Sequence, residues 1–135
     1  FRKAFDAGVP FICGSESGFS VTPYGDWHYK ELEVFVDKLK MTPLEAITCA
    51  TKNAAKAMRK ENILGLISPG YKADLLVIDG DPSKDVSILG KKELIKHVIL
   101  DGKEVDLTPA PERIKDPDGW RISSYSGKIL KKNNS

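Results

Sequence analysis

A short apolar run between a proline and a glycine places the strongest constraint on how this chain folds. The run is "PFICGS", from Pro10 to Ser15, and it ends at Glu16. Apolar residues without polar alternation are typical of a strand covered on both faces, as in a parallel sheet. Upstream, residues 1–7 have the pattern of an amphipathic helix that Gly8 terminates. The start of the chain therefore predicts a helix, a buried strand, and a carboxylate where that strand ends.

Two further helices are predicted after a loop rich in Gly, Ser and Pro. The first has one apolar face, with residues at positions i, i+3, i+4 and i+7: Leu32, Phe35, Val36 and Leu39. The second begins in "MTPLEAI", because Thr42 can cap it, Pro43 suits the first helical position, and Glu45 completes a capping box. Thr51 offers another possible cap before "KNAAKAMRK". The first half is therefore mainly helical.

The pattern changes from helix to strand at Asn62. A Pro-Gly turn at residues 69–70 precedes the β-rich run Leu75 to Ile78, which Gly80 to Pro82 ends. Two short strands then flank Asp101-Gly102, one of the strongest short hairpin signals. The second half is therefore predicted to be a small β unit.

Composition excludes several classes of protein. The chain has 135 residues, is 41% hydrophobic and 30% charged, and carries a formal net charge of +2. It can therefore bury a core, and its charge does not favour nucleic acid or an anionic membrane as a partner. No apolar run approaches the roughly 20 residues of a membrane helix. Cys13 and Cys49 form no CxxC motif, which favours two reduced thiols and a cytoplasmic location.

Glu16 is the first candidate for chemistry. It follows an apolar strand, and the small residues Ser15, Ser17 and Gly18 leave room around it. In a barrel of parallel strands and helices, catalytic groups lie at the carboxyl ends of the strands. The other interpretation is that a buried strand turns polar where it reaches the surface. Composition and periodicity leave both interpretations open.

The two histidines differ in their surroundings. His97 lies in the run "KHVIL", where a half-exposed structural histidine is the favoured interpretation. His28 follows Trp27 at the start of a predicted helix, so it is either a substrate contact or a helix-start histidine with no fixed role. Two histidines and one carboxylate do not build a closed metal site with its supporting hydrogen bonds.

Other catalytic patterns are missing from the sequence. It has no HExxH, HxH, Walker loop or GxSxG motif. "GSESG" has a glutamate where a serine nucleophile would stand, and Ser15 and Ser17 have no identified base. Four aspartates lack the spacing of a calcium loop and are interpreted as turn residues: Asp74, Asp79, Asp81 and Asp85.

Four segments together carry a resemblance to a known family. They are "AGVPFICGSESG", "ELEVFVDKLKMTPLEAITCATKNAAKAM", "LGLISPGYKADLLVIDGDP" and "IKHVILDGKEV", and they cover roughly Asp6 to Val105. The pattern GxIxPGxxADLxVxDGDP within the third is the most specific. The chain resembles the C-terminal third of the amidohydrolase superfamily, in particular its imidazolonepropionase-like and Xaa-Pro or Xaa-Arg dipeptidase group.

The resemblance implies an α/β fold and a metal-dependent hydrolase that acts on carbon–nitrogen bonds. Its members have a (β/α)₈ TIM barrel and a small β-sandwich built from both chain ends. Residues 1–61 would supply the last strand and helices of the barrel, and residues 62–107 would supply strands of the sandwich. Residues 108–135 would form a C-terminal tail.

The resemblance also implies roles for individual residues. In the family, an aspartate after the eighth strand contacts the metal and takes the proton of the attacking water. Glu16 stands at that position, since "GSESG" replaces "GTDSG" or a similar sequence. Glu16 is thus the implied catalytic and metal-binding residue, with a divalent metal, zinc, as cofactor. Tyr24, Trp27 and His28 are the implied substrate contacts in the loop that follows.

The change from aspartate to glutamate matters physically. Glutamate reaches one methylene further, whereas a catalytic constellation tolerates only about 0.5 Å of error. Its carboxylate has the same charge and a similar basicity. Glu16 therefore either keeps the metal and base role, which we favour, or marks a lost or altered activity.

The remaining metal ligands of the family are not in this chain. We therefore expect a fragment, or one of two chains that complete the enzyme, with no hydrolysis by itself. A lone strand cannot close a barrel, and open apolar edges favour binding to the rest of the barrel, to a second chain or to a homo-oligomer partner. The expected substrate is a small amide or peptide. The alternative is a non-catalytic or degenerate module that acts with a partner chain.

Overall fold

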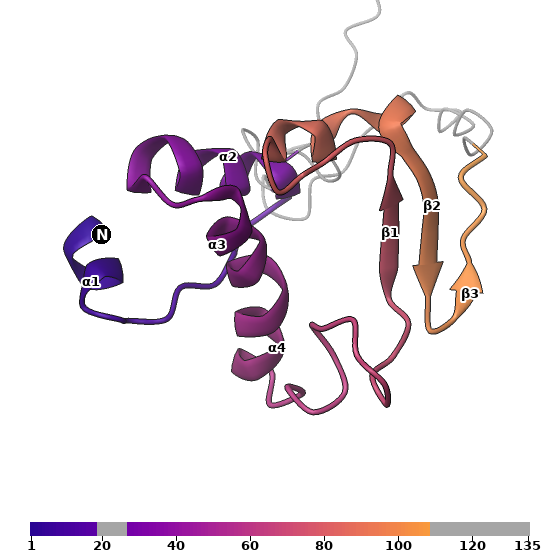
Figure 1. Ribbon diagram of the computed structural model, residues 1–135, viewed down its shortest axis with the longest axis horizontal. Helices are drawn as coiled ribbons and strands as arrows, with labels where there is room; N and C mark the ends of the chain where they lie inside the picture. The colour runs from indigo at the N-terminus through magenta and orange to yellow at the C-terminus, as the bar shows by residue number, and fades with distance from the viewer. Residues whose placement is uncertain (19–26, 109–135) are drawn as a thin grey trace, which may run out of the picture.

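The computed structural model describes residues 1–18 and 27–108 of the chain (Figure 1). Helices lie on one side and a small antiparallel sheet on the other, so the fold is α/β. The helical side contains α1 (Arg2–Asp6), α2 (His28–Leu39), α3 (Pro43–Thr48), the π-helix η1 (Cys49–Asn53) and α4 (Ala54–Ala57). The other side contains β1 (Leu75–Ile78), the 3₁₀ helices η2 (Val86–Gly90) and η3 (Lys92–Leu94), β2 (Ile95–Leu100) and β3 (Lys103–Glu104).

The core forms where α2, α3 and η2 meet. Its buried members are Leu32, Phe35, Met41, Ala46, Cys49 and Val86. The predicted apolar face of α2 is confirmed, because Leu32 and Phe35 are buried while Val36 and Leu39 are partly buried against them. In the described part of the chain, no helix is both long enough and apolar enough to cross a bilayer.

Three phenylalanines connect α1 and the segment after it to this core. The Phe11 ring meets the Phe5 ring edge-on at a centroid distance of 6.0 Å, and it meets the Phe35 ring in the same way at 6.2 Å. Edge-to-face pairs at such distances are favourable beyond the area that they bury. Phe11 therefore joins α1 to α2 through one side chain.

Arg2 makes a second connection between α1 and α2. Its Nη1 atom donates to the carbonyl oxygens of Leu39, at 2.7 Å, and of Lys40, at 2.8 Å. These carbonyls end α2, where Lys40 takes a left-handed conformation with φ of 54°. A cation at this end also opposes the negative end of the helix dipole. As predicted, α1 itself ends just before Gly8, whose φ is 80°.

The predicted start of α3 is confirmed, whereas the possible cap at Thr51 is wrong. Thr42 accepts from the Glu45 backbone N–H, and the Glu45 carboxylate accepts from the Thr42 N–H at 2.7 Å, which is a full capping box. Thr51 lies inside η1, between α3 and α4, so the helical path continues through it. Its hydroxyl donates back to the Ile47 carbonyl at 2.8 Å, as threonines in helix interiors often do.

The predicted β unit is confirmed. β1 has the predicted bounds, and it pairs antiparallel with β2, which in turn pairs with β3. Asp101 and Gly102 form the turn with φ of 52° and 78°, both in the left-handed region that this type of hairpin requires. Aspartates act as turn residues, as expected: Asp74 accepts from the Asp101 N–H and Asp85 from the Ser87 N–H.

The ring of Tyr29 ties the first turn of α2 to the end of η2. A β-carbon added to Gly90 would lie 2.3 Å from Cε2 of Tyr29, so only glycine fits beneath this ring. Val86 and Leu89 of η2 pack against the same core as α2. The helical side and the sheet side are therefore in direct contact at this point.

The expected strand over Pro10–Ser15 is wrong as a doubly buried element. The segment is extended, but these residues form no ladder with any other described residue. Phe11 and Cys13 are partly buried, whereas Ile12 is 48% exposed. Helices cover one side of the segment, and no described layer covers the other. Apolar content alone predicted two covering layers, whereas the described residues supply one.

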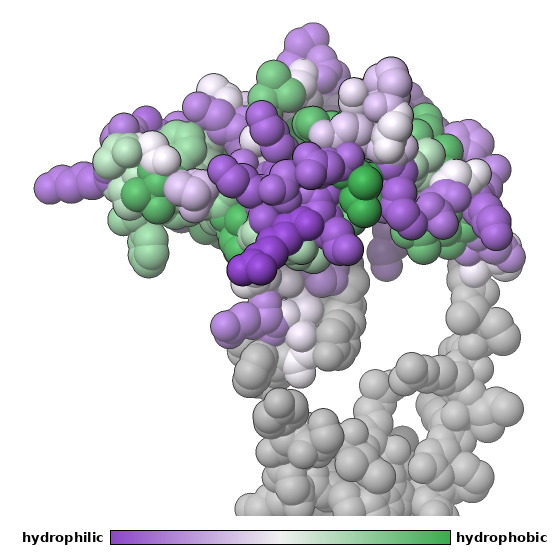
Figure 2. Space-filling view, turned by 90° about the horizontal axis from the view of Figure 1, so that it is seen from below, coloured by the Kyte–Doolittle hydropathy of each residue, from purple (hydrophilic) through white to green (hydrophobic). Residues whose placement is uncertain are grey.

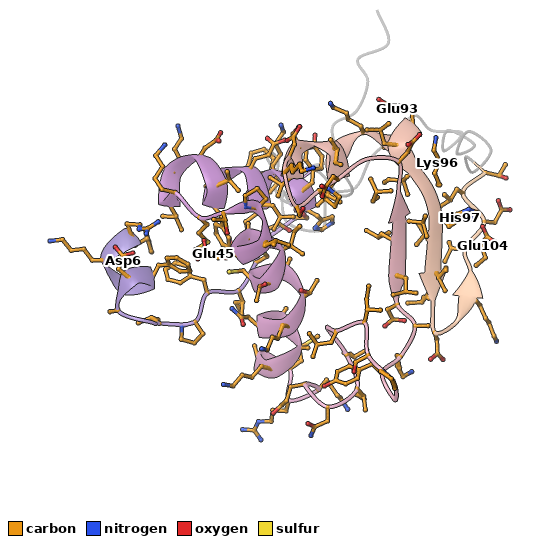
Figure 3. The ribbon with its side chains drawn as sticks, in the orientation of Figure 1. Asp6, Glu45, Glu93, Lys96, His97 and Glu104 are labelled. Atoms are coloured by element: carbon orange, nitrogen blue, oxygen red, sulfur yellow. The ribbon has the colours of Figure 1, made fainter. Side chains whose placement is uncertain are left out.

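The capping box predicts a pH dependence of stability. Hydrogen bonds from the Thr42 backbone N–H and then from its hydroxyl lower the pKa of Glu45. A carboxylate with a lowered folded-state pKa stabilises the fold above its unfolded pKa, and this contribution is lost as pH falls through the folded value. We expect the free energy of unfolding in urea to decrease below about pH 5, and Glu45→Gln to remove part of that decrease. Glu93→Gln, outside the capping box (Figure 3), is the control, and an equal effect of both changes would contradict the assignment.

Two glycines with the same backbone conformation test packing against strain. Gly65 and Gly70 have φ of 86° and 87°. A β-carbon at Gly65 would lie 2.8 Å from the Thr51 carbonyl oxygen, whereas one at Gly70 would meet nothing within 4 Å. We expect Gly70→Ala to cost about 1–2 kcal/mol from the left-handed conformation alone. Gly65→Ala should cost clearly more in the free energy of unfolding, and equal losses would show that the contact with η1 is unimportant.

Candidate functional site

The candidate site is the extended segment from Phe11 to Gly18, whose residues alternate in exposure. Phe11, Cys13, Ser15 and Ser17 are partly buried, whereas Ile12, Gly14, Glu16 and Gly18 are exposed. Successive side chains of an extended chain point to opposite faces. Glu16 therefore shares its face with Ile12, away from the helices that cover Phe11 and Cys13. The carboxylate is neither buried nor turned into the core.

Two polar side chains from the helices hold the backbone of this segment. Asn53, the last residue of η1, donates from Nδ2 to the Phe11 carbonyl oxygen at 3.0 Å. Glu31, in the first turn of α2, accepts from the Gly14 backbone N–H at 2.8 Å. Backbone groups need partners, and here side chains satisfy two that no strand ladder satisfies. The segment is thus fixed to the helices on both sides of Cys13.

The π-helix explains how Asn53 reaches Phe11. A π-helix has a wider turn than an α-helix, and such turns are frequent at functional sites. Asn53 lies one such turn after Cys49, with its Nδ2 atom 4.0 Å from the Cys49 sulfur. Cys49 is buried in the core, so Asn53 stands above the core and next to the segment. The sequence pattern did not identify Asn53. The available signal was that asparagine, a poor helix former, stands inside a helix.

A chain of three side chains lies at the end of the segment. Ser15 Oγ is 2.9 Å from Ser17 Oγ and 3.1 Å from Nδ1 of His28. The structure thus supplies the basic partner for Ser15 that the sequence did not identify. Within the described residues, however, no carboxylate bonds to His28, so the three-residue arrangement of a serine hydrolase is incomplete.

The backbone of Glu16 is in the left-handed region, with φ of 46°. For a residue with a β-carbon this conformation costs about 1–2 kcal/mol, and such outliers concentrate at functional sites. It is one of four non-glycine residues with positive φ among those described, and the other three end helices or form the hairpin turn: Lys40, Arg59 and Asp101. Glu16 instead stands at the end of the extended segment, two residues before a turn at Gly18.

The predicted site residues lie as follows. Tyr24 falls outside the described residues. Trp27 is 37% exposed just before α2, and His28 is the exposed first residue of that helix. The structure therefore brings His28 to the serines that flank Glu16. His97 lies elsewhere, in β2, where its Nδ1 atom is 2.6 Å from the Glu104 carboxylate across the hairpin (Figure 3).

Cys13 lies beneath the site but is not a nucleophile at neutral pH. Burial raises the pKa of its thiol to about 12, and the negative charges of Glu31 and Cys49 add to this. Both cysteines are free, and Cys49 is buried. Since the thiolate is the reactive form, Cys13 serves the packing of the segment.

Glu16 fits a metal site as one ligand and not as a whole site. Carboxylate oxygens are common ligands of zinc, and Glu16 is exposed at the end of the segment. Among the described residues, no group of three or more His, Cys, Asp or Glu side chains could hold a metal ion. A cavity of about 270 Å³ lies elsewhere, between α2, α3 and η2, with Val36, Pro43 and Val86 in its wall. Further ligands would have to come from other parts of the protein.

Several apolar side chains near the start of the chain are exposed. Ile12, which is exposed like Glu16, has an exposed fraction of 48%, and Val9 and Phe1 are 50% and 92% exposed. Figure 2 shows apolar residues interspersed with hydrophilic ones, including at the end of the molecule where α1 lies in Figure 1. Ile12 is thus an aliphatic side chain of the segment that no described layer covers.

The sequence matches a family profile described as "Amidohydrolase family" over residues 1–105. The chain belongs to this family. It is 32% identical to the ochratoxinase of Aspergillus niger over 104 residues, which are 76% of the chain and 21% of that enzyme. It is 32% identical to an imidazolonepropionase of Flavobacterium johnsoniae over 103 residues, which are 76% of the chain and 25% of that enzyme.

A solved structure in the amidohydrolase family has a similar fold. It is a Xaa-Pro dipeptidase with methionine bound in the active site, with a TM-score of 0.67 and 35% identity. The match covers 78% of the present chain and 24% of that protein. The chain thus spans about a fifth to a quarter of the length of these relatives. The resemblance found in the sequence is confirmed.

The raised pKa of Cys13 predicts slow alkylation. At pH 7.5 we expect iodoacetamide to modify Cys13 at least tenfold more slowly in the folded protein than in the same protein in urea, because burial suppresses the thiolate. Mass spectrometry of the peptides that contain Cys13 and Cys49 measures each rate separately. Equal rates for Cys13 in the two conditions would contradict its buried, protonated state.

Proposed function

We propose that this chain is the C-terminal part of a metal-dependent amidohydrolase that hydrolyses a carbon–nitrogen bond in a small amide or peptide. One observation carries the proposal: Glu16 is exposed at the end of an extended segment whose opposite face is fixed to helices. A carboxylate in this position faces the side on which the rest of a barrel would lie. Family membership supports hydrolysis as the reaction class.

In the proposed enzyme, residues 1–61 form the last strand and helices of a (β/α)₈ barrel. Residues 62–107 contribute strands to a small β-sandwich, and residues 108–135 form a tail. Two observations support this arrangement: no described layer covers the second side of the segment, and Leu76 and Val77 of β1 are 56% and 43% exposed. The rest of the barrel, from the same or a second chain, would cover the first of these surfaces. We also propose self-association, and the two free cysteines support a cytoplasmic location.

Glu16 acts as the general base in this proposal. Its carboxylate accepts a proton from the attacking water and returns it to the leaving nitrogen. When a divalent metal is bound, zinc in our proposal, it lowers the pKa of water from 15.7 to about 7 and polarises the carbonyl. Glu16 would be one of its ligands. The ligands that complete the site would come from other parts of the protein, since the described residues hold no group of three and the sequence has no HxH motif.

The exposed side chains that follow Glu16 would form a wall of the substrate site. Trp27 is half-exposed and has an apolar ring with one polar N–H, which suits contact with a small amide or peptide. His28 is exposed beside it, and Tyr24 is the third residue that we propose as a substrate contact. The relatives are named for different activities, as an ochratoxinase, an imidazolonepropionase and a Xaa-Pro dipeptidase, so we propose that loops beyond this chain determine the substrate.

A specific observation also favours a second candidate, a degenerate module without catalysis. The residue in the expected aspartate position is a glutamate, one methylene longer. The backbone of Glu16 has a positive φ of 46°, which retracts or redirects the carboxylate relative to an extended residue. If this change in the direction of the side chain does not compensate for the extra length of glutamate, the metal site is incomplete. The chain then serves only in association with a partner.

Substitution of Glu16 in the complete protein distinguishes the two candidates. We expect Glu16→Ala and Glu16→Gln to lower kcat for hydrolysis of a panel of Xaa-Pro dipeptides and N-acyl amino acids at least 100-fold, because both remove the base. Elemental analysis should show less bound zinc. Glu16→Asp should retain part of the activity, and Glu93→Ala, another exposed glutamate, should change neither quantity. Unchanged zinc content and activity in Glu16→Ala would remove Glu16 from the mechanism and favour the degenerate module.

A further inference from the structure

We propose that His28 and Glu31, one helical turn apart at the start of α2, are positioning residues that hold Glu16 in its working orientation. This inference rests on the proposed function of Glu16. The sequence predicted neither role: it left His28 either as a substrate contact or as a helix-start histidine with no fixed role, and it gave no role to Glu31. Both side chains reach the segment at residues next to Glu16 or two before it.

Glu31 anchors the backbone just before Glu16. Its Oε2 atom accepts from the Gly14 backbone N–H at 2.8 Å. A hydrogen bond to a carboxylate is about twice as strong as one between neutral groups. Gly14 has no side chain to pack, so this bond is what fixes its peptide unit against α2. The backbone that leads into Glu16 is therefore anchored two residues before the carboxylate.

His28 contacts Ser15, the residue before Glu16. Its Nδ1 atom lies 3.1 Å from Ser15 Oγ, which lies 2.9 Å from Ser17 Oγ. Ser15 and Ser17 flank Glu16, and both are on the partly buried face. Glu16, between them, is exposed, so contacts that hold both serines on the helix side keep the Glu16 side chain on the exposed side. His28 thus acts on Glu16 through Ser15.

The strained backbone of Glu16 explains why such contacts are needed. A φ of 46° is unfavourable for glutamate, so the segment would relax unless its neighbours fix it. His28 and Glu31 are three residues apart and lie on one face of the same helix. A rigid element holding the segment at two points suits a site whose geometry must be kept within about 0.5 Å.

The test uses the complete protein, with zinc affinity measured by competition with a chelator and hydrolysis measured on a Xaa-Pro dipeptide. We expect His28→Ala and Ser15→Ala each to lower kcat at least tenfold, with KM within a factor of two, since misplacement of about 1 Å can cost 100-fold. The double variant should be no worse than either single variant, because both break the same chain of contacts. His28→Asn, which keeps a polar atom near the position of Nδ1, should recover part of kcat.

Glu31 has its own variants and a matched control on the same helix. Glu31→Ala should weaken zinc binding and lower kcat, whereas Glu31→Gln, which keeps an acceptor for the Gly14 N–H, should lose less. Glu33→Ala removes a carboxylate that pairs with Lys30 at 2.6 Å instead of bonding to the segment, so it should leave both readouts unchanged. His97→Ala is the corresponding control for His28, and circular dichroism checks that every variant is folded.

The outcomes separate this inference from the proposed function. A rise in KM with unchanged kcat in His28→Ala, or additive losses in the double variant with Ser15→Ala, would overturn the positioning role and indicate direct substrate contact. Loss of activity in Glu16→Ala, together with unchanged zinc affinity and kcat in His28→Ala and Glu31→Ala, would overturn this inference alone. No loss in Glu16→Ala would overturn both.

Discussion

The structure depends on how side chains of the helices hold an extended segment, from Phe11 to Gly14, that pairs with no described strand. Phe11 places its ring between Phe5 and Phe35, and the backbone on either side of Cys13 bonds to Asn53 and Glu31. In a sheet, neighbouring strands would satisfy these backbone groups. Here the helices do so with side chains, so two polar residues, Asn53 and Glu31, must be held in fixed positions. The location of Glu16 at the end of the segment follows from these contacts.

This arrangement explains why helices cover one face of the segment while residues on the other face are exposed. The helix side has a packed core, a protonated cysteine and satisfied backbone groups. The opposite side has Ile12 and Glu16, an aliphatic residue and a carboxylate that both reach the surface. Membership of the amidohydrolase family and coverage of a fifth to a quarter of its relatives' length agree with a face that meets other parts of a larger protein.

Local signals in the sequence predicted most of the secondary structure. The capping box at Thr42 and Glu45, the apolar face of α2 and the Asp101-Gly102 hairpin depend only on residues close together in the chain, so their patterns were sufficient. The doubly buried strand and the cap at Thr51 were wrong for a different reason. Burial of the strand depends on layers that the sequence pattern assumes, and Thr51 joined a helix that tertiary packing continues through a π turn.

The candidate site was predictable only in part. Glu16 could be found because it ends an apolar run, and family resemblance gave it a role. Its left-handed backbone could not be foreseen, since glutamate has no preference for that conformation. The bonds from Glu31 and Asn53 join residues 17 and 42 positions apart, and no periodic pattern encodes such pairings. His28 and Ser15 were each noted, but only the fold brings them together.

The ring of Tyr29 over Gly90 has a consequence for the molecule as a whole. Tyr29 lies between His28 and the rest of α2, and it rests on the end of the 3₁₀ helix that leads from β1 toward β2. The 3₁₀ helix η2 thus supports the first turn of α2. In this way the β half, to which we assign no catalytic residue, would fix the position of His28 and Glu31, which hold Glu16. Selection on catalysis would then also act on Gly90.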